Sequence, residues 1–270
     1  MSELAIREIQ LETLKIIKVI DSICKKENLK YTLFYGSLIG AVRHKGFIPW
    51  DDDLDIAMPR PDYDKLEKYF LANEKELSPY KLFSYKTVDN YPFMINRICN
   101  TDFDYRGENE VYCGMGTFVD IYPIDGWGDG SDRRLGGASH IYSSMYYMKS
   151  RLHFERDNGF IKNSVKHILD FISHFYSLKT LRNKLLKCAA HYNYETSDKV
   201  ACIVWDGQKT PLDKKIFEDV VRVPFEDTEL LIPKKYDEIL RHYYGDYMQL
   251  PPENERVGHH YYHIYTKENQ

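Results

Sequence analysis

The first part of the chain carries apolar side chains at helical spacing in two stretches. From residue 3 to residue 27 they recur every three or four positions, which predicts a long helix. Ser2 is expected to cap its start and Asn28 to end it, because these residue types favour those positions. A second helix is expected from Pro61 through residue 73, since proline is favoured in the first turn of a helix.

Five short stretches are rich in β-branched and aromatic residues and are bounded by turn residues, which predicts strands. They are residues 31–35, 54–58, 81–85, 93–99 and 117–122. The first of these strands is expected to stop at Gly36 and the second at Pro59. This order of helices and strands predicts a mixed α/β fold, of the α+β type, with a mixed sheet at its core.

The pattern changes near residue 130, after which helical, aromatic-rich stretches dominate. Helices are expected at 134–156, 164–192 and 234–247, the last ended by Gly245, and a hairpin of strands at 220–225 and 228–233. We therefore expect a sheet-based core over residues 1–130 and a helical region over residues 131–270 that packs on it.

Length and composition fit a globular protein. With 270 residues, 43% of them hydrophobic, the chain can bury a substantial core. The N-terminal residues carry charges every few positions, so they form neither a secretory signal nor a membrane span, and a cytoplasmic location is expected. The five cysteines are scattered without a CxxC pair, which fits reduced thiols. A structural zinc site at Cys99 and Cys113 is the alternative.

Charge is unevenly distributed along the chain. The net charge is −4, but residues 149–187 hold nine Lys or Arg against three Asp or Glu, a local charge of +6. The remaining residues therefore sum to −10. This basic, aromatic-rich segment is either a solvated helix face or a surface for an anionic membrane or a polyanionic acceptor. The acidic total and the lack of a groove-reading motif argue against nucleic-acid binding.

The sequence GFIPWDDDLDIAMPR, residues 46–60, places four aspartates within five positions directly before an apolar strand. Residues two apart on a strand point to the same face, so Asp53 and Asp55 should lie together, joined by Asp51 if the strand begins early enough. Adjacent carboxylates raise each other's pKa unless a cation lies between them. A divalent metal is therefore expected, and oxygen ligands in low number favour Mg²⁺ or Mn²⁺.

The acidic run could also serve a calcium loop or a simple turn. A calcium-binding EF-hand loop requires glycine at its sixth position and glutamate at its twelfth, where this chain has Ile56 and Asp62, so the EF-hand is disfavoured. An acidic turn whose aspartates cap the helix beginning near Pro61, or bind nothing, is left open by these residues alone.

The sequence on either side adds groups suited to phosphate and metal binding. Gly36 and Ser37 follow a strand, so backbone amides there can approach a phosphate, and Arg43 and Lys45 add positive charge in the same loop. Asp120 is a lone carboxylate in an otherwise apolar strand, where an unpartnered acid is costly. The order Gly-Ser, Asp-x-Asp and a later Asp is the one used by the nucleotidyltransferase superfold, in which three carboxylates hold two metal ions.

Three segments of the chain resemble the LicD family, the bacterial phosphocholine transferases related to fukutin-type phosphotransferases. They are YGSLIGAVRHKGFIPWDDDLDIAMPRPDY (35–63), FVDIYPIDG (118–126) and YGDYMQLPPENERVGHH (244–260). The likeness reaches from about Leu29 to His260, although residues 130–200 match nothing sharply. It implies transfer of phosphocholine from CDP-choline to a sugar hydroxyl of a cell-surface glycopolymer, or of its lipid-linked precursor, with release of CMP.

The resemblance also implies roles for individual residues. Asp53, Asp55 and Asp120 would hold one or two Mg²⁺ or Mn²⁺ ions, and either Asp51 or Asp52 would take the proton of the acceptor. The candidates for contacts to the donor's diphosphate are Gly36, Ser37, Arg43 and Lys45. Arg256, His259 and His260 are the candidates for closing over the phosphates. Trp50, with Trp205 and several tyrosines, is the candidate for the choline pocket.

Several alternatives stay open at this stage. The donor could carry ribitol phosphate or glycerol phosphate in place of phosphocholine. The reaction could be a true nucleotidyl transfer with release of pyrophosphate, or the chain could bind metal and nucleotide without turnover. The basic segment also leaves open a peripheral contact with the cytoplasmic face of the membrane.

Overall fold

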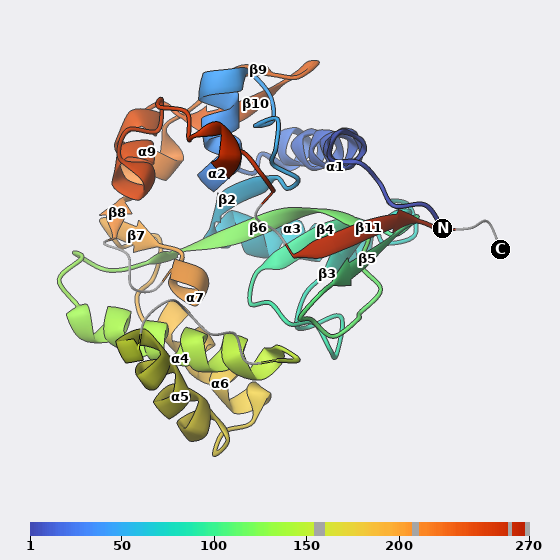
Figure 1. Ribbon diagram of the computed structural model, residues 1–270. Coiled ribbons are helices and arrows are strands. Elements are labelled where there is room, and N and C mark those ends of the chain that lie inside the picture. The colour runs from blue at the N-terminus through green and yellow to red at the C-terminus, as the bar shows by residue number, and fades with distance from the viewer. Residues whose placement is uncertain (154–159, 207–210, 259–260, 268–270) are drawn as a thin grey trace.

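The central element of the fold is a mixed β-sheet (Figure 1). The computed structural model describes residues 1–153, 160–206, 211–258 and 261–267. The main path of the sheet runs β1 (Thr32–Leu33), β2 (Asp55–Pro59), β6 (Thr117–Gly126), β4 (Asn96–Asn100) and β3 (Tyr80–Phe83). The sheet is extended from β6 by β7 (Lys199–Ala201) and then β8 (Leu212–Asp213). β2 and β6 run parallel, and the other neighbouring pairs described in this sheet run antiparallel.

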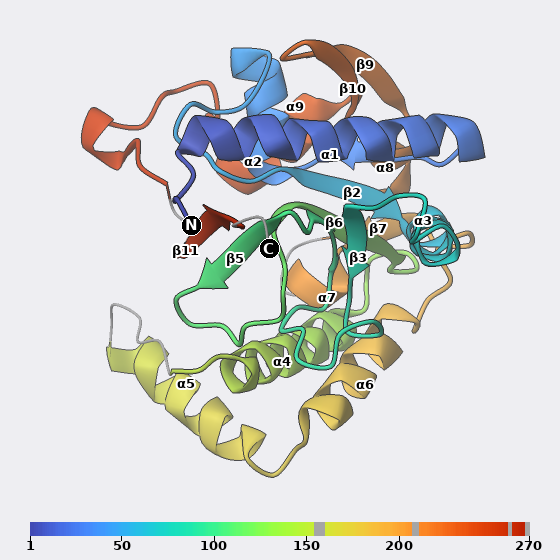
Figure 2. The same ribbon diagram turned by 90° about the vertical axis from the view of Figure 1, so that its right-hand side faces the viewer.

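Helices cover both faces of this sheet (Figure 2). α1 (Ile6–Glu27) lies across one face, where its apolar stripe, including the fully buried Ile16, Ile17 and Ile20, packs against β6 and β4. On the other side lie α4 (Arg133–Ser150), α5 (Phe160–Ser173) and α6 (Leu178–Ala189), with the short α7 (Ile203–Asp206) packed against both α4 and β6. α3 (Arg60–Ala72) follows β2 directly and packs against β2, β3 and β6.

The chain after the helical layer returns to the sheet and to the elements around it. It forms α8 (Lys214–Glu218), a hairpin of β9 (Val220–Phe225) and β10 (Thr228–Pro233), α9 (Tyr236–Tyr244), the 3-10 turn η2 (Glu253–Glu255) and β11 (Tyr262–Thr266). β11 pairs with β5 (Phe103–Gly107), so the two ends of the described chain come together at this small sheet. The division of the chain at residue 130 stays a prediction. In the described parts of the chain, no helix combines the length and the apolar character needed to cross a bilayer.

Several sequence predictions are confirmed. The fold is mixed α/β of the α+β type. The first helix ends at Asn28, which adopts the left-handed conformation with φ of 52°, and α9 is followed by Gly245 with φ of 65°. The predicted hairpin has the predicted ends, since Phe225 pairs with Thr228 across the turn of Glu226 and Asp227.

Other boundaries differ for local reasons. α1 begins at Ile6, not near Ser2, because the Glu8 carboxylate accepts a hydrogen bond from the Ala5 N–H at 2.8 Å. The strand predicted at 31–35 ends at Leu33, since Tyr35, with φ of 41°, turns the chain into α2 (Tyr35–Ile39) and the π-helical turn η1 (Gly40–His44).

The helical region is also divided differently from the prediction. The helix expected over 134–156 ends at Ser150. The helix expected over 164–192 is two helices, because the hydroxyl of Ser177 accepts a hydrogen bond from the Thr180 N–H at 3.0 Å and starts α6. β5 and β11 were not predicted.

Candidate active site

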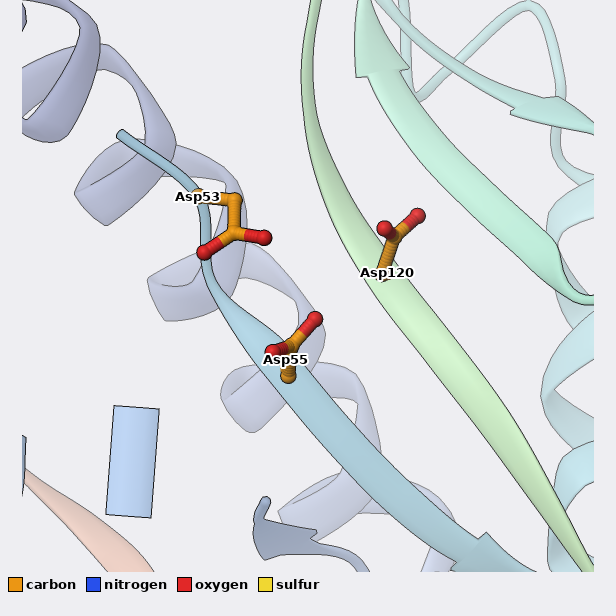
Figure 3. Close-up of side chains that lie close together, drawn as sticks. All are labelled: Asp53, Asp55 and Asp120. Carbon is orange, nitrogen blue, oxygen red and sulfur yellow. The ribbon is translucent and has the colours of Figure 1, made fainter. Parts of the chain in front are cut away.

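Three carboxylates converge where β2 begins beside β6 (Figure 3). One oxygen from each of Asp53, Asp55 and Asp120 lies within 4.8 Å of the other two. Asp55 is opposite Asp120 in the parallel register, and the Asp120 N–H donates a 2.9 Å hydrogen bond to the carbonyl of Leu54. This bond fixes the chain just before β2, so Asp53 enters the cluster from the same side. The structure thus brings together the three residues predicted as metal ligands.

Asp55 is the buried member of the cluster that most needs a cation. Its side chain is buried, and no residue in the described parts of the chain donates a hydrogen bond to its Oδ1. Burial raises the pKa of Asp55 well above its usual range, and the negative charges of Asp53, Asp120 and Asp51 raise it further. A buried carboxylate oxygen without a donor, facing other carboxylates, is what a divalent cation with oxygen ligands would satisfy. The residues present therefore fit Mg²⁺ or Mn²⁺.

Arg97 lies beside the cluster, although the sequence pattern did not single it out. It lies opposite Asp120 on β4, and its Nε and Nη2 donate to the two Asp120 oxygens at 2.5 and 3.1 Å. Its guanidinium lies between two aromatic rings, 3.9 Å from the centroid of Phe93 and 4.0 Å from that of Phe118. Arg97 therefore offsets one negative charge of the cluster. The available signal was the only charged residue of the predicted strand 93–99, a signal similar to the lone acid that pointed to Asp120.

The residues before β2 form a loop, not a strand, which corrects one expectation. Because β2 begins at Asp55, Asp51 and Asp53 do not share a strand face with it. Instead, the loop is held by Gln10 of α1, whose amide donates to the carbonyls of Asp51 at 2.7 Å and Ile48 at 3.1 Å. The Asp51 side chain lines a cavity beside the cluster.

Asp52 is not part of the cavity lining, and within the described chain none of the four aspartates caps the next helix. The Asp52 side chain is buried and is not among the residues that line the cavity, and its backbone carbonyl accepts a hydrogen bond from the Tyr262 hydroxyl at 3.1 Å. α3 has Pro59 at its cap position and no side-chain capping bond. The acidic run is therefore not a helix cap.

A cavity of about 750 Å³ opens beside the carboxylate cluster. Asp51, Asp53 and Asp55 contribute to its lining. The segment after α9, called the rim segment below, contributes Asp246, Tyr247, Gln249, Leu250, Pro251 and Pro252. Much of the remaining wall is aromatic. The aromatic lining consists of Tyr35, Trp50, Tyr122, Trp205, Tyr243, Tyr244 and Tyr247. The cavity therefore joins a strongly anionic corner to an extended aromatic surface.

The Gly-Ser turn at the start of α2 supports the site in two ways. Gly36 lines the cavity, and a Cβ at this position would lie 2.7 Å from Oδ2 of Asp51, so glycine permits that carboxylate to approach. Ser37 is buried, and its hydroxyl accepts a 2.8 Å hydrogen bond from the Asp55 N–H. Ser37 thus fixes the first residue of β2, and its side chain is not part of the cavity lining.

The predicted basic residues are divided between the cavity and the surface. Arg43 lines the cavity, but its Nη1 donates to the carbonyl of Tyr247 at 2.7 Å and so holds the rim segment in place. Lys45 is exposed and is not part of the lining. Arg256 donates to the carbonyl of Pro251 at 2.9 Å, with its guanidinium 5.8 Å from the ring centre of Trp50. The predicted contacts of His259 and His260 lie outside the described residues.

The thiols do not form a second metal site within the described chain. None of the five cysteines, all of which lie in the described parts of the chain, forms a disulfide, and burial raises the pKa of the Cys99 and Cys113 thiols. Among residues 1–153, 160–206, 211–258 and 261–267, the acidic cluster is the single group of three or more His, Cys, Asp or Glu side chains close enough to share a metal ion. The zinc alternative therefore finds no ligand set in the described residues.

One family model and several related proteins match the sequence of this chain. The family model described as "LicD/FKTN/FKRP, nucleotidyltransferase domain" matches residues 28–133, the stretch that holds all three clustered carboxylates and Arg97. Two uncharacterized proteins match over shorter stretches: one from Rickettsia typhi is 32% identical over 43% of this chain and 35% of its own length, and one from Rickettsia prowazekii is 44% identical over 19% and 20%.

A relative named for an enzymatic activity matches over nearly its whole length. The lipopolysaccharide cholinephosphotransferase LicD of Haemophilus influenzae strain Rd is 31% identical, and the match covers 96% of this chain and 97% of the relative. It therefore includes the aromatic wall and the rim of the cavity as well as the acidic cluster. The match with the H. influenzae protein covers nearly the whole chain, and the family model matches the residues that hold the cluster, so the chain belongs to the LicD family.

Proposed function

We propose that this protein transfers phosphocholine from CDP-choline to a sugar hydroxyl of a cell-surface glycan, or of its lipid-linked precursor, and releases CMP. The observation that carries this proposal is the junction of the carboxylate cluster with the aromatic cavity. Likeness to the cholinephosphotransferase of H. influenzae along almost the whole chain supports the same reaction. A cytoplasmic location for the reaction stays a prediction.

In this reaction the acceptor oxygen forms a bond to the phosphorus next to choline, while the bond from that phosphorus to the CMP oxygen breaks. The acceptor loses its hydroxyl proton, and CMP leaves with the electron pair of the broken bond. Phosphoryl transfer of this kind depends mainly on charge neutralisation and in-line placement. The protein must therefore collect cations around the diphosphate and orient the acceptor.

Asp53, Asp55 and Asp120 are the proposed ligands of one or two Mg²⁺ or Mn²⁺ ions. When bound, such an ion neutralises charge on the phosphates and polarises the bond that breaks. Arg97 holds Asp120 through both carboxylate oxygens and so fixes its orientation. Ser37 does the same for the backbone of Asp55.

Asp51 is the proposed general base. Its carboxylate lines the cavity, close to Gly36, whereas Asp52 is buried away from the lining. A base must come within hydrogen-bond reach of the proton that it removes, and only a group on the cavity wall can meet an acceptor there. The geometry therefore favours Asp51 over Asp52.

The aromatic wall is the proposed binding surface for the trimethylammonium group. Quaternary ammonium ions bind to the faces of aromatic rings, with Trp the most favourable. The rings of Tyr35 and Tyr122 lie 5.1 Å apart between centroids, those of Tyr122 and Trp205 5.5 Å, and those of Tyr35 and Tyr243 5.4 Å. Ribitol phosphate and glycerol phosphate carry no cation and would gain little from this wall. The cavity therefore favours choline over these alternatives.

Incubation with CDP-choline, CDP-ribitol and CDP-glycerol, each with a lipooligosaccharide acceptor and Mg²⁺ or Mn²⁺, tests the proposal. We expect CMP release coupled to acceptor-bound phosphocholine, seen by chromatography and ³¹P NMR, with CDP-choline preferred. Asp53→Asn is the inactive control. Pyrophosphate release from CTP with nucleotide attached to the acceptor would show nucleotidyl transfer instead. Binding of CDP-choline without any product, across a panel of acceptor glycans, would favour a binding module.

A further inference from the structure

α5 carries a row of exposed apolar side chains on the outside of the helical layer. The row continues into the turn that follows α5, and Phe171 and Phe175 are 66% and 75% exposed. Positions three or four apart share one side of a helix, so these residues form a continuous stripe. The stripe consists of Val165, Ile168, Phe171, Ile172 and Phe175.

Most of the described large apolar side chains of α5 face away from the core. α5 packs on α4, on the far side of α4 from the sheet (Figures 1 and 2). The half-buried or buried side chains along it include the polar Lys166, Asp170 and Ser173. Leu169 is the one described large apolar side chain of α5 that packs partly against the core. A surface helix normally turns its apolar stripe toward the core. A contiguous outward stripe of this kind marks a binding surface.

The charge around the stripe indicates what kind of surface it meets. Residues 160–189 contain six Lys or Arg against the single acid Asp170, in a chain whose net charge is −4. Of these six, Lys166, Arg182 and Lys184 are half-buried. Lys179 and Lys187, on α6, are exposed, and Lys179 follows Phe175 by four positions. Basic side chains beside an outward apolar stripe are the combination that binds an anionic lipid surface.

We propose that α5, together with the exposed lysines of α6, which follows it after residues 174–177, lies on an anionic lipid bilayer, with the stripe in the headgroup boundary. Pairing of the same face between two copies of the chain is disfavoured, because it would bring two regions of equal positive charge together. This surface is separate from the catalytic cavity, and it would hold the protein where a lipid-linked acceptor is anchored. Binding to lipid needs neither donor nor turnover, so its test is independent of the proposed reaction.

Vesicle flotation tests the surface directly. The full-length protein is mixed with vesicles of phosphatidylcholine alone or with about 30% phosphatidylglycerol, and the bound fraction is measured after centrifugation. We expect binding to the anionic vesicles that weakens as NaCl is raised, and at least tenfold weaker binding to phosphatidylcholine. Phe171→Glu/Phe175→Glu should lower the apparent partition coefficient at least tenfold, with an unchanged circular dichroism spectrum.

A matched control uses two exposed leucines elsewhere. Leu11 on α1 and Leu71 on α3 are 43% and 47% exposed, so Leu11→Glu/Leu71→Glu adds the same charge without touching the stripe. The control should bind as the wild type does. The proposal is overturned if the wild type stays in the soluble fraction with anionic vesicles, or if both variants lose binding equally. It is also overturned if light scattering shows a dimer that only the Phe171→Glu/Phe175→Glu variant disrupts.

Discussion

Asp55→Asn should stabilise the metal-free protein and abolish its response to divalent metal. In the folded chain, oxygens of Asp55 lie within 4.8 Å of oxygens of both Asp53 and Asp120. Two like charges at that separation repel by about 3.5 kcal/mol at an effective dielectric constant of about 20. Asp55 relieves part of this repulsion by binding a proton, so we expect a net gain in unfolding free energy of about 2 kcal/mol at pH 7.

The asparagine side chain suits the site when no metal is present. Its NH₂ group can donate to a neighbouring carboxylate, in the place where Oδ1 of Asp55 has no partner. For a chain of this length, about 1 kcal/mol corresponds to about 2 °C in melting temperature, so the expected rise is about 4 °C. Thermal unfolding followed by circular dichroism in EDTA measures it. Wild type should gain about 2.7 kcal/mol at a metal concentration of about 100 times Kd, whereas Asp55→Asn should gain little.

The pH dependence of metal-free stability provides a second readout. Burial and the neighbouring charges raise the pKa of Asp55, so the folded protein keeps a proton at pH values where the unfolded chain has lost it. Wild-type stability should therefore fall as pH rises from the unfolded pKa of about 4 through the raised folded pKa. Asp55→Asn should lack this part of the slope.

One control variant completes the test, and two possible results would refute its reasoning. Asp89 is exposed on a loop, so Asp89→Asn should change neither the melting temperature in EDTA nor the metal response. The electrostatic reasoning fails if Asp55→Asn melts below wild type in EDTA. The assignment of metal ligands fails if Asp55→Asn keeps the wild-type increase in melting temperature with Mn²⁺ or Mg²⁺.

Three further substitutions test other parts of the site. Gly36→Ala should displace the Asp51 carboxylate, because the new Cβ would lie 2.7 Å from its Oδ2. We expect kcat to fall at least tenfold with little change in metal-induced stabilisation, and an unchanged kcat would exclude Asp51 as the base. Arg97→Gln leaves Asp120 buried without its ion-pair partner, so urea unfolding should show a free energy of unfolding lower by about 3–5 kcal/mol, partly restored by Mn²⁺. A decrease below about 1 kcal/mol would contradict the structural role of the pair. Trp205→Leu should raise KM for CDP-choline about tenfold and leave KM for CDP-glycerol unchanged, because a desolvated cation–π contact is worth up to about 2 kcal/mol. Equal changes in KM for both donors would show that choline binds elsewhere.

Local sequence signals were sufficient where neighbours along the chain decide the outcome. The hairpin at 220–233 and the ends of helices at Asn28 and Gly245 follow from residue types that suit those backbone angles. Local sequence signals were insufficient where an element depends on a contact with distant residues or on one specific side-chain contact. The start of α1 depends on the reach of Glu8 back to Ala5, and β5 exists beside residues more than 150 positions later in β11.

The sequence by itself identified the carboxylates, their family and the need for a cation, because four acids before an apolar strand and a lone acid within another are costly without one. Only the tertiary structure decided which acids meet, since the parallel register of β2 and β6 sets Asp55 beside Asp120. It also revealed Arg97 beside the cluster, Asp52 outside the cavity lining, and an aromatic wall built from separate segments. Contacts between residues far apart in the chain depend on how strands pair and helices pack, which residue spacing alone does not specify.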